Sequence, residues 1–122
     1  MEKVILDTNI LIEILKGNNN TISKVKSFED IYISSISVME LYYGALNKAE
    51  VNKLEKFISL FHIIELNEKI STTSTKLIKT YAKSHNLDIP DSLIASTTLV
   101  YGYNLFTYNI KDFRYIDGIH LV

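Results

Sequence analysis

Three carboxylates stand out because each lies where an apolar stretch or a turn leads into a helical pattern. Asp7 follows the apolar run at residues 4–6, Glu40 lies within an apolar segment, and Asp91 follows Pro90. If the three corners meet at one edge of a sheet, these carboxylates repel one another unless a proton or a cation neutralises them. A hard divalent ion such as Mg²⁺ or Mn²⁺ suits oxygen ligands. The pattern therefore predicts a divalent metal site.

Each of these carboxylates also has a purely structural interpretation. Asp7 is a residue type that caps the N-terminus of a helix. Ser37 and Glu40 have the Ser-x-x-Glu spacing of a capping box. Asp91 would be favoured near the positive end of its helix, for which Asp88 is the expected cap. Capping does not exclude chemistry, because the start of a helix also holds a carboxylate rigidly.

The elements that must position these residues alternate between strands and helices. Strands are expected at residues 4–6, 31–34, 62–66, 104–107 and 119–122. Helices are expected at about residues 10–15, 21–28 with Thr21 as cap, 38–46 with Glu40 in the first turn, 51–61, 67–85 with Asn67 as cap, and 92–101. This order predicts an α/β fold: a three-layer α/β/α sandwich with a mainly parallel sheet of four or five strands. Right-handed crossovers would place the corner after each strand on the same edge.

Composition narrows the function classes. The 122 residues, 47% of them hydrophobic, fit one domain spanning residues 1–122. The net charge of −1 argues against a polyanion partner bound through bulk charge. The absence of cysteine excludes disulfides and thiolate sites, and three scattered histidines argue against a zinc hydrolase. With neither a signal-peptide pattern nor a membrane span in the sequence, we expect a soluble, cytoplasmic protein with no membrane partner.

Four short motifs, taken in order, resemble those of PIN domains, and within that superfamily those of VapC-type ribonuclease toxins from toxin–antitoxin modules. They are VILDTNIL at residues 4–11, ISVMELYYGA at 36–45, IPDSLIA at 89–95 and LFTYNIKDF at 105–113. Each motif is weak alone, but the ordered set is specific and spans nearly the whole chain. The resemblance implies an endoribonuclease that depends on Mg²⁺ or Mn²⁺ and hydrolyses phosphodiester bonds with an activated water.

The acidic residues of the family map onto Asp7, Glu40 and Asp91 as catalytic residues. The resemblance implies that Asp7 and Asp91 bind the metal, with Glu40 binding directly or through water. Either Glu40 or Asp91 would accept the proton of the attacking water. The family's fourth acidic position falls on Asn109, an uncharged amide, so a second ion would bind weakly there. Asp112 could partly substitute, or could serve only as a turn residue.

Other positions in the motifs are expected to support the metal and the substrate. Thr8, Asn9 and Thr107 match the small polar residues that surround the metal in the family, where they would orient carboxylates or water. Lys111 and Arg114 flank the fourth corner and are candidates for binding the RNA phosphates.

The resemblance also implies partners. These are an RNA substrate, whether tRNA, rRNA or mRNA, a second copy of the chain in a homodimer, and a cognate antitoxin that covers the active-site groove. Tyr42, Tyr43 and the apolar segment from Leu11 to Leu15 are the expected antitoxin contacts. The alternative is a catalytically weak PIN-like module that binds RNA or protein, which the amide at Asn109 keeps open.

Overall fold

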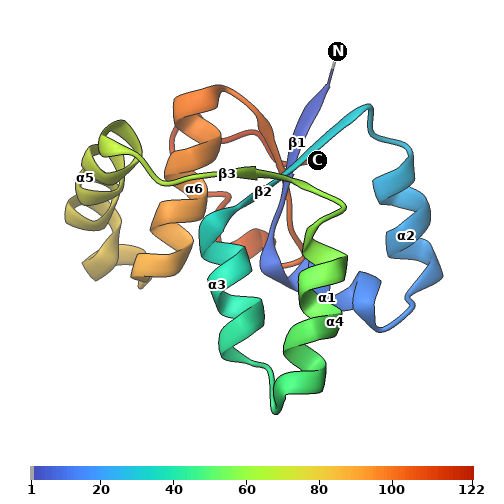
Figure 1. The fold of residues 1–122 in the computed structure, drawn as a ribbon. Helices are drawn as coiled ribbons and strands as arrows, with labels where there is room; N and C mark the ends of the chain where they lie inside the picture. Colours follow the sequence, from blue (N-terminus) through green and yellow to red (C-terminus); the bar gives the residue numbers. More distant parts are fainter. Residues whose placement is uncertain (1) are drawn as a thin grey trace.

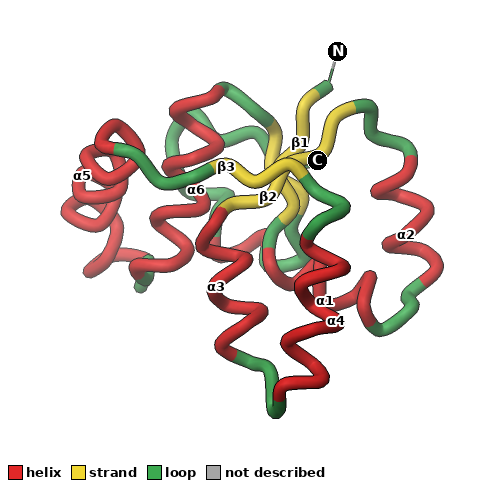
Figure 2. Tube along the Cα trace, viewed as in Figure 1, coloured by secondary structure: helices red, strands yellow, loops and turns green. Residues whose placement is uncertain are grey.

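The computed structural model describes residues 2–122, which form a parallel four-stranded sheet with helices on both faces (Figures 1 and 2). The strands are β1 (Lys3–Leu6), β2 (Asp30–Ser34), β3 (His62–Ile64) and β4 (Asn104–Phe106). The helices are α1 (Thr8–Leu15), α2 (Asn19–Lys26), α3 (Ser35–Tyr43), α4 (Lys48–Ile58), α5 (Glu68–His85) and α6 (Ile89–Tyr101), followed by a short 3₁₀ turn, η1 (Ile110–Asp112). The predicted three-layer α/β/α sandwich is confirmed, with four strands. None of the helices within residues 2–122 combines the length and the apolar character needed to cross a membrane.

Strand β1 lies at the centre of two hydrophobic cores, which explains its unbroken run of aliphatic residues. Val4 and Leu6 point into a core formed with α1, α2, α3 and α4. Ile5 points to the opposite face and packs with α5, α6 and the C-terminal segment. All three side chains are fully buried. In Figure 1, α5 and α6 accordingly lie on one side of the sheet and α2 on the other.

The strand order β3-β2-β1-β4 determines which corners meet. The chain moves outward from β1 to β2 and β3, and then α5 and α6 carry it back to β4, on the other side of β1. The direction of winding therefore reverses between β1 and β4, and open α/β sheets bind ligands at this switch point. Asp7 follows β1 and Thr107 follows β4, so both residues lie at the carboxyl edge beside the switch point.

Several predicted boundaries were wrong for local reasons. Helix α2 begins before Thr21, because the side chain of Asn18 accepts hydrogen bonds from the backbone at its start, and Thr21 is buried inside the helix. Helix α4 begins at Lys48, directly after its cap Asn47. The predicted strand at 119–122 is reduced to one parallel bridge to Leu105. The predicted caps of α5 and α6, Asn67 and Asp88, are confirmed.

Candidate active site

Asp7 is the most constrained carboxylate at this edge, with only 4% of its surface exposed. It caps α1, and its Oδ1 accepts a hydrogen bond from the Thr8 amide at 2.8 Å. Its Oδ2 accepts from Thr107 Oγ1 at 2.8 Å and from Asn9 Nδ2 at 3.2 Å. Burial raises the pKa of Asp7, the hydrogen bonds from Thr107 and Thr8 lower it, and the charge of Glu40 raises it again. The capping interpretation is therefore correct, and it coexists with a fixed, partly desolvated carboxylate.

Glu40 reaches the same edge from α3. The cap of α3 is Ser34, whose Oγ accepts from the Ile36 amide at 3.1 Å. The capping-box interpretation of Ser37 and Glu40 was therefore wrong, and Glu40 lies in the second turn of the helix rather than the first. Its exposed side chain turns toward α1, where Oε1 accepts a hydrogen bond from Thr8 Oγ1 at 2.7 Å. That contact joins two segments that are 32 residues apart in the chain.

Ser37 completes a hydroxyl relay that the sequence did not reveal. Thr8 Oγ1 lies 2.8 Å from Ser37 Oγ and 2.7 Å from Glu40 Oε1, yet a hydroxyl has one proton to donate. An ionised carboxylate only accepts, so Thr8 donates to Glu40 and Ser37 must donate to Thr8. Ser37 is fully buried, one helical turn before Glu40. The Ser-x-x-Glu spacing was the sequence signal that links Ser37 to Glu40, although we interpreted it as a helix cap.

Asp91 lies in the first turn of α6, where the Asp88 side chain accepts a hydrogen bond from its amide at 2.9 Å. The pKa of Asp91 is raised to about 7, first by burial and then by the charges of Asp88, Asp7, Asp112 and Glu40, in that order. The charge of Glu40 therefore raises the pKa of both Asp7 and Asp91, and the charge of Asp7 also raises the pKa of Asp91. Asp88 was predicted only as a cap, and it adds negative charge to the group.

The corner after β4 is tied to α1 by hydrogen bonds. Thr107 Oγ1 accepts from the Asn109 amide at 3.0 Å and from Asn9 Nδ2 at 3.3 Å, while it donates to Asp7. Asn9 Oδ1 in turn accepts from the Tyr108 amide at 3.2 Å. The predicted supporting residues Asn9 and Thr107 therefore contact Asp7 directly. Asn109 itself is brought into this network through its backbone.

The remaining predicted residues lie at the rim of this group. Asp112 and Lys111 are exposed in η1, and Arg114 is exposed just beyond it. Asp112, three residues after the amide at Asn109, is close enough for its charge to raise the pKa of Asp91. No ion pair involving Lys111 or Arg114 is found within residues 2–122. Their role as phosphate ligands stays a prediction.

The donor set at this edge fits a hard cation. Its side chains offer carboxylate, hydroxyl and amide oxygens, and no thiolate or histidine was found among the contacts that hold Asp7 and Glu40 within residues 2–122. In the part of the chain that the structure describes, no three acidic or histidine side chains stand close enough to bind one ion together. Mg²⁺ is commonly held by one or two carboxylates with waters and substrate phosphates. The residues therefore fit an ion with few protein ligands.

A groove with a volume of about 380 Å³ runs between α1, α3 and α4 and has Glu40 in its wall. Ile12 and Leu15 of α1 line it and are 40% and 45% exposed. Its other lining residues are Leu41, Gly44, Ala45, Glu50, Lys53 and Leu54. The predicted partner surface needs correction at two positions: Leu11 is fully buried, and Tyr42 packs against the core, so neither forms the exposed groove wall. Tyr43 is 93% exposed.

Comparisons with known proteins agree with this fold. The model of the PIN domain family matches residues 4–119. A protein named ribonuclease VapC1 from Rickettsia felis is 31% identical, and the alignment covers 98% of this chain and 94% of that protein.

Solved structures give the same result. The structure of VapBC2 from Rickettsia felis, bound to a DNA fragment from its promoter, matches with a TM-score of 0.82 and 31% identity, covering 98% of this chain and 96% of that one. A toxin–antitoxin complex from Klebsiella pneumoniae matches with a TM-score of 0.83 and 29% identity, again covering 98% and 96%. Since both the family model and these relatives span almost the full length, the chain belongs to the PIN domain family and is a VapC-type member of it.

Proposed function

We propose that this protein is a metal-dependent endoribonuclease of the toxin class, inhibited by a cognate antitoxin. The observation that carries the proposal is the position of Asp7 at the switch point of the sheet, where Thr8 links it to Glu40 by hydrogen bonds and where its charge raises the pKa of Asp91. The charge of Glu40 raises the pKa of both Asp7 and Asp91, and the charge of Asp7 raises the pKa of Asp91, as expected for carboxylates grouped to take up a cation and a substrate phosphate. Relatives named ribonuclease VapC support the same activity.

Asp7 and Asp91 would hold Mg²⁺ or Mn²⁺, with Glu40 binding directly or through water. When bound, such an ion would lower the pKa of a water molecule and withdraw charge from a phosphodiester oxygen. Thr107, Asn9 and the Thr8 amide fix the two oxygens of Asp7 by hydrogen bonds, so this carboxylate is already oriented. Because the pKa of Asp91 is about 7, a proton on this carboxyl group competes with the cation at neutral pH.

Glu40 is our candidate for accepting the proton of the attacking water. Thr8 donates to Oε1 at 2.7 Å, and Glu40 is an exposed residue, so its second carboxylate oxygen would be available to accept a proton. The hydroxyl relay from Ser37 through Thr8 would hold the carboxylate in this orientation. Asn109 adds no negative charge, so we expect one tightly bound ion rather than two.

The groove beside Glu40 is our candidate surface for the antitoxin. Its exposed Ile12 and Leu15 would receive apolar side chains, and the neighbouring carboxylates would attract a basic one. Structures titled as toxin–antitoxin complexes are among those this chain resembles. We further propose that the protein acts in the cytoplasm, where its RNA substrate is available. We also propose that it forms a homodimer.

The decisive experiment compares the wild type with Asp7→Asn. The purified proteins are incubated with cellular RNA in Mg²⁺, in Mn²⁺ and in EDTA, and new RNA ends are mapped by sequencing. We expect discrete cuts by the wild type only when the metal is present, and none by Asp7→Asn. Asp117→Asn is the matched control, because it removes an exposed carboxylate outside the cluster and should leave cleavage unchanged.

Two results would count against the proposal. Cleavage that persists in EDTA, or in the Asp7→Asn protein, would exclude the metal-dependent mechanism. RNA binding by the wild type without any metal-dependent cleavage would favour the alternative of a binding module, which the amide at Asn109 supports. The mapped ends would also show whether tRNA, rRNA or mRNA is the substrate.

A further inference from the structure

Tyr108 is an exposed aromatic residue next to the carboxylate cluster. It follows Thr107, whose hydroxyl donates to Asp7, and it is 49% exposed. Its backbone amide donates to Asn9 Oδ1, and Asn9 also contacts Asp7. The backbone of Tyr108 is therefore tied to the residues around Asp7, and none of the roles described above uses its exposed ring.

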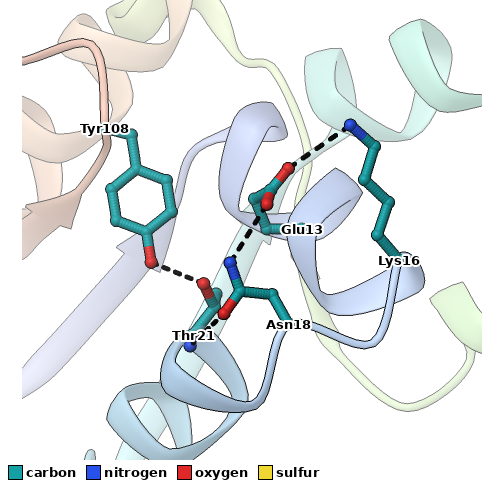
Figure 3. Close-up of polar contacts among 5 residues, drawn as sticks. All are labelled: Glu13, Lys16, Asn18, Thr21 and Tyr108. Carbon is teal, nitrogen blue, oxygen red and sulfur yellow. Dashed lines mark hydrogen bonds and ion pairs between the residues drawn. The ribbon is translucent and has the colours of Figure 1, made fainter.

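Two side-chain contacts hold the ring in place. The Phe106 ring packs against it in a T-shaped arrangement with a centroid separation of 5.4 Å. Its hydroxyl group pairs with Thr21 Oγ1 of α2 at 2.5 Å, and Figure 3 shows this group pointing to Thr21. Thr21 is fully buried, so its hydroxyl needs such a partner. With its backbone and both ends of its side chain fixed, Tyr108 loses little freedom when a ligand binds to its exposed surface.

The anchor of Tyr108 is itself part of a network. Asn18 caps α2, and its Oδ1 accepts from the Thr21 amide at 3.3 Å. Asn18 Nδ2 donates to Glu13 Oε1 of α1 at 3.1 Å, and Glu13 pairs with Lys16 at 3.5 Å (Figure 3). The start of α2 is thereby fixed to α1, so the position of the Tyr108 ring is set by the same helix that positions Asp7.

The carboxylates of the candidate active site oppose the binding of RNA, because both are negatively charged. Asp7, Glu40, Asp88, Asp91 and Asp112 repel the phosphates of a substrate, and the chain as a whole carries a net charge of −1. Affinity must therefore come partly from contacts that do not depend on charge. Single-stranded RNA offers unpaired bases, which stack on exposed aromatic rings regardless of their sequence.

We propose that the exposed ring of Tyr108 is a stacking platform for an RNA base next to the bond that is cleaved. This inference rests on the proposed ribonuclease function and names one contact of its substrate. Lys24 lies one helical turn after Thr21, with its Nζ 5.9 Å from the centre of the Phe106 ring that supports Tyr108. It provides a nearby cation for the phosphate of the stacked nucleotide.

The test measures stacking rather than cleavage. A single-stranded RNA oligonucleotide carrying the fluorescent base 2-aminopurine is titrated with the full-length protein in EDTA. We expect the wild type to quench the fluorescence, and Tyr108→Ala to lose the quenching and to bind about tenfold more weakly. Tyr101→Ala is the matched control: Tyr101 is 42% exposed at the end of α6, at the opposite edge of the sheet, and its loss should change neither quantity.

The variant Tyr108→Phe distinguishes the role of the ring in RNA stacking from the role of the hydroxyl group in stabilising the fold. It keeps the ring but removes the partner of the buried Thr21 hydroxyl, so it should lower the melting temperature while RNA binding and quenching persist. If that variant unfolds, Tyr108→Phe combined with Thr21→Val keeps the ring and removes both hydroxyls, which preserves the test.

The outcomes distinguish this inference from the proposed function. A folded Tyr108→Ala protein that binds and quenches like the wild type overturns the inference, even if the wild type cleaves RNA. A wild-type protein that quenches through Tyr108 but never cuts RNA in Mg²⁺ or Mn²⁺ overturns the proposed function and leaves the stacking contact supported.

Discussion

Replacing Asp91 with asparagine should stabilise the fold at neutral and alkaline pH, because it removes a carboxylate that burial and four neighbouring carboxylates disfavour. The pKa of Asp91 is raised from 3.8 to about 7 in the folded protein. The folded state therefore binds this proton more tightly than the unfolded chain does. The stabilisation that comes from this proton is complete below pH 3.8 and is lost as the pH rises through about 7.

The expected change in the free energy of unfolding follows from the pKa shift of Asp91. At about 1.4 kcal/mol per pKa unit, a rise from 3.8 to about 7 corresponds to about 4 kcal/mol. Asp91 keeps part of its surface exposed, and solvent screening reduces this figure, so we expect about 2 kcal/mol. For a chain of this size, that difference raises the melting temperature by about 7 °C.

The assay is urea unfolding of the wild type and Asp91→Asn in metal-free buffer across the acid to alkaline range. We expect the two free energies of unfolding to be similar near pH 4 and to diverge up to about pH 8, with the variant the more stable. Asp117→Asn, which alters an exposed carboxylate outside the cluster, should follow the wild type at every pH. The reasoning would be refuted by a difference in the free energy of unfolding that does not change with pH, or by an Asp91→Asn protein that is less stable than the wild type at pH 8.

Two further predictions concern the relay and the groove. Ser37→Ala should slow RNA cleavage about 10- to 100-fold with little change in KM, because it removes the hydroxyl that holds Thr8 in place as the donor to Glu40. Ser37→Thr should restore much of the rate, and single-turnover kinetics would measure both variants. Ile12→Glu should weaken antitoxin binding at least about tenfold in a calorimetric titration, because it places a charge in the apolar groove, while cleavage by the free protein persists. Leu60→Glu, at a 77% exposed position outside the groove, should bind the antitoxin normally; equal losses in both variants would contradict the assignment of the groove.

The sequence alone was sufficient to predict the architecture, because its signals are local. The aliphatic run at residues 4–6 predicts a strand buried on both faces, and Asn67 and Asp88 mark the starts of two helices through their own side-chain hydrogen bonds. Asp7 was also identifiable as a residue at the carboxyl end of that strand. Such predictions require only the backbone and its near neighbours.

Predictions from local sequence patterns were wrong where the same residues fit two different helix starts. The Ser-x-x-Glu pattern at Ser37 fits a capping box, but α3 begins earlier, at the cap Ser34, and this shift turns Ser37 inward as the donor to Thr8. Thr21 was expected to cap a helix, whereas Asn18 takes that role and leaves Thr21 buried.

Only the tertiary structure decided which side chains meet. The contacts of Thr8 with Glu40, Thr107 with Asp7, and Thr21 with Tyr108 join segments that are 32, 100 and 87 residues apart. Each depends on the strand order β3-β2-β1-β4, which places β4 beside β1 and so closes the edge of the sheet around Asp7. The sequence determined which residues could do chemistry at that edge, whereas the packing of α2, α3 and α6 around it set their neighbours and raised the pKa of Asp7 and Asp91.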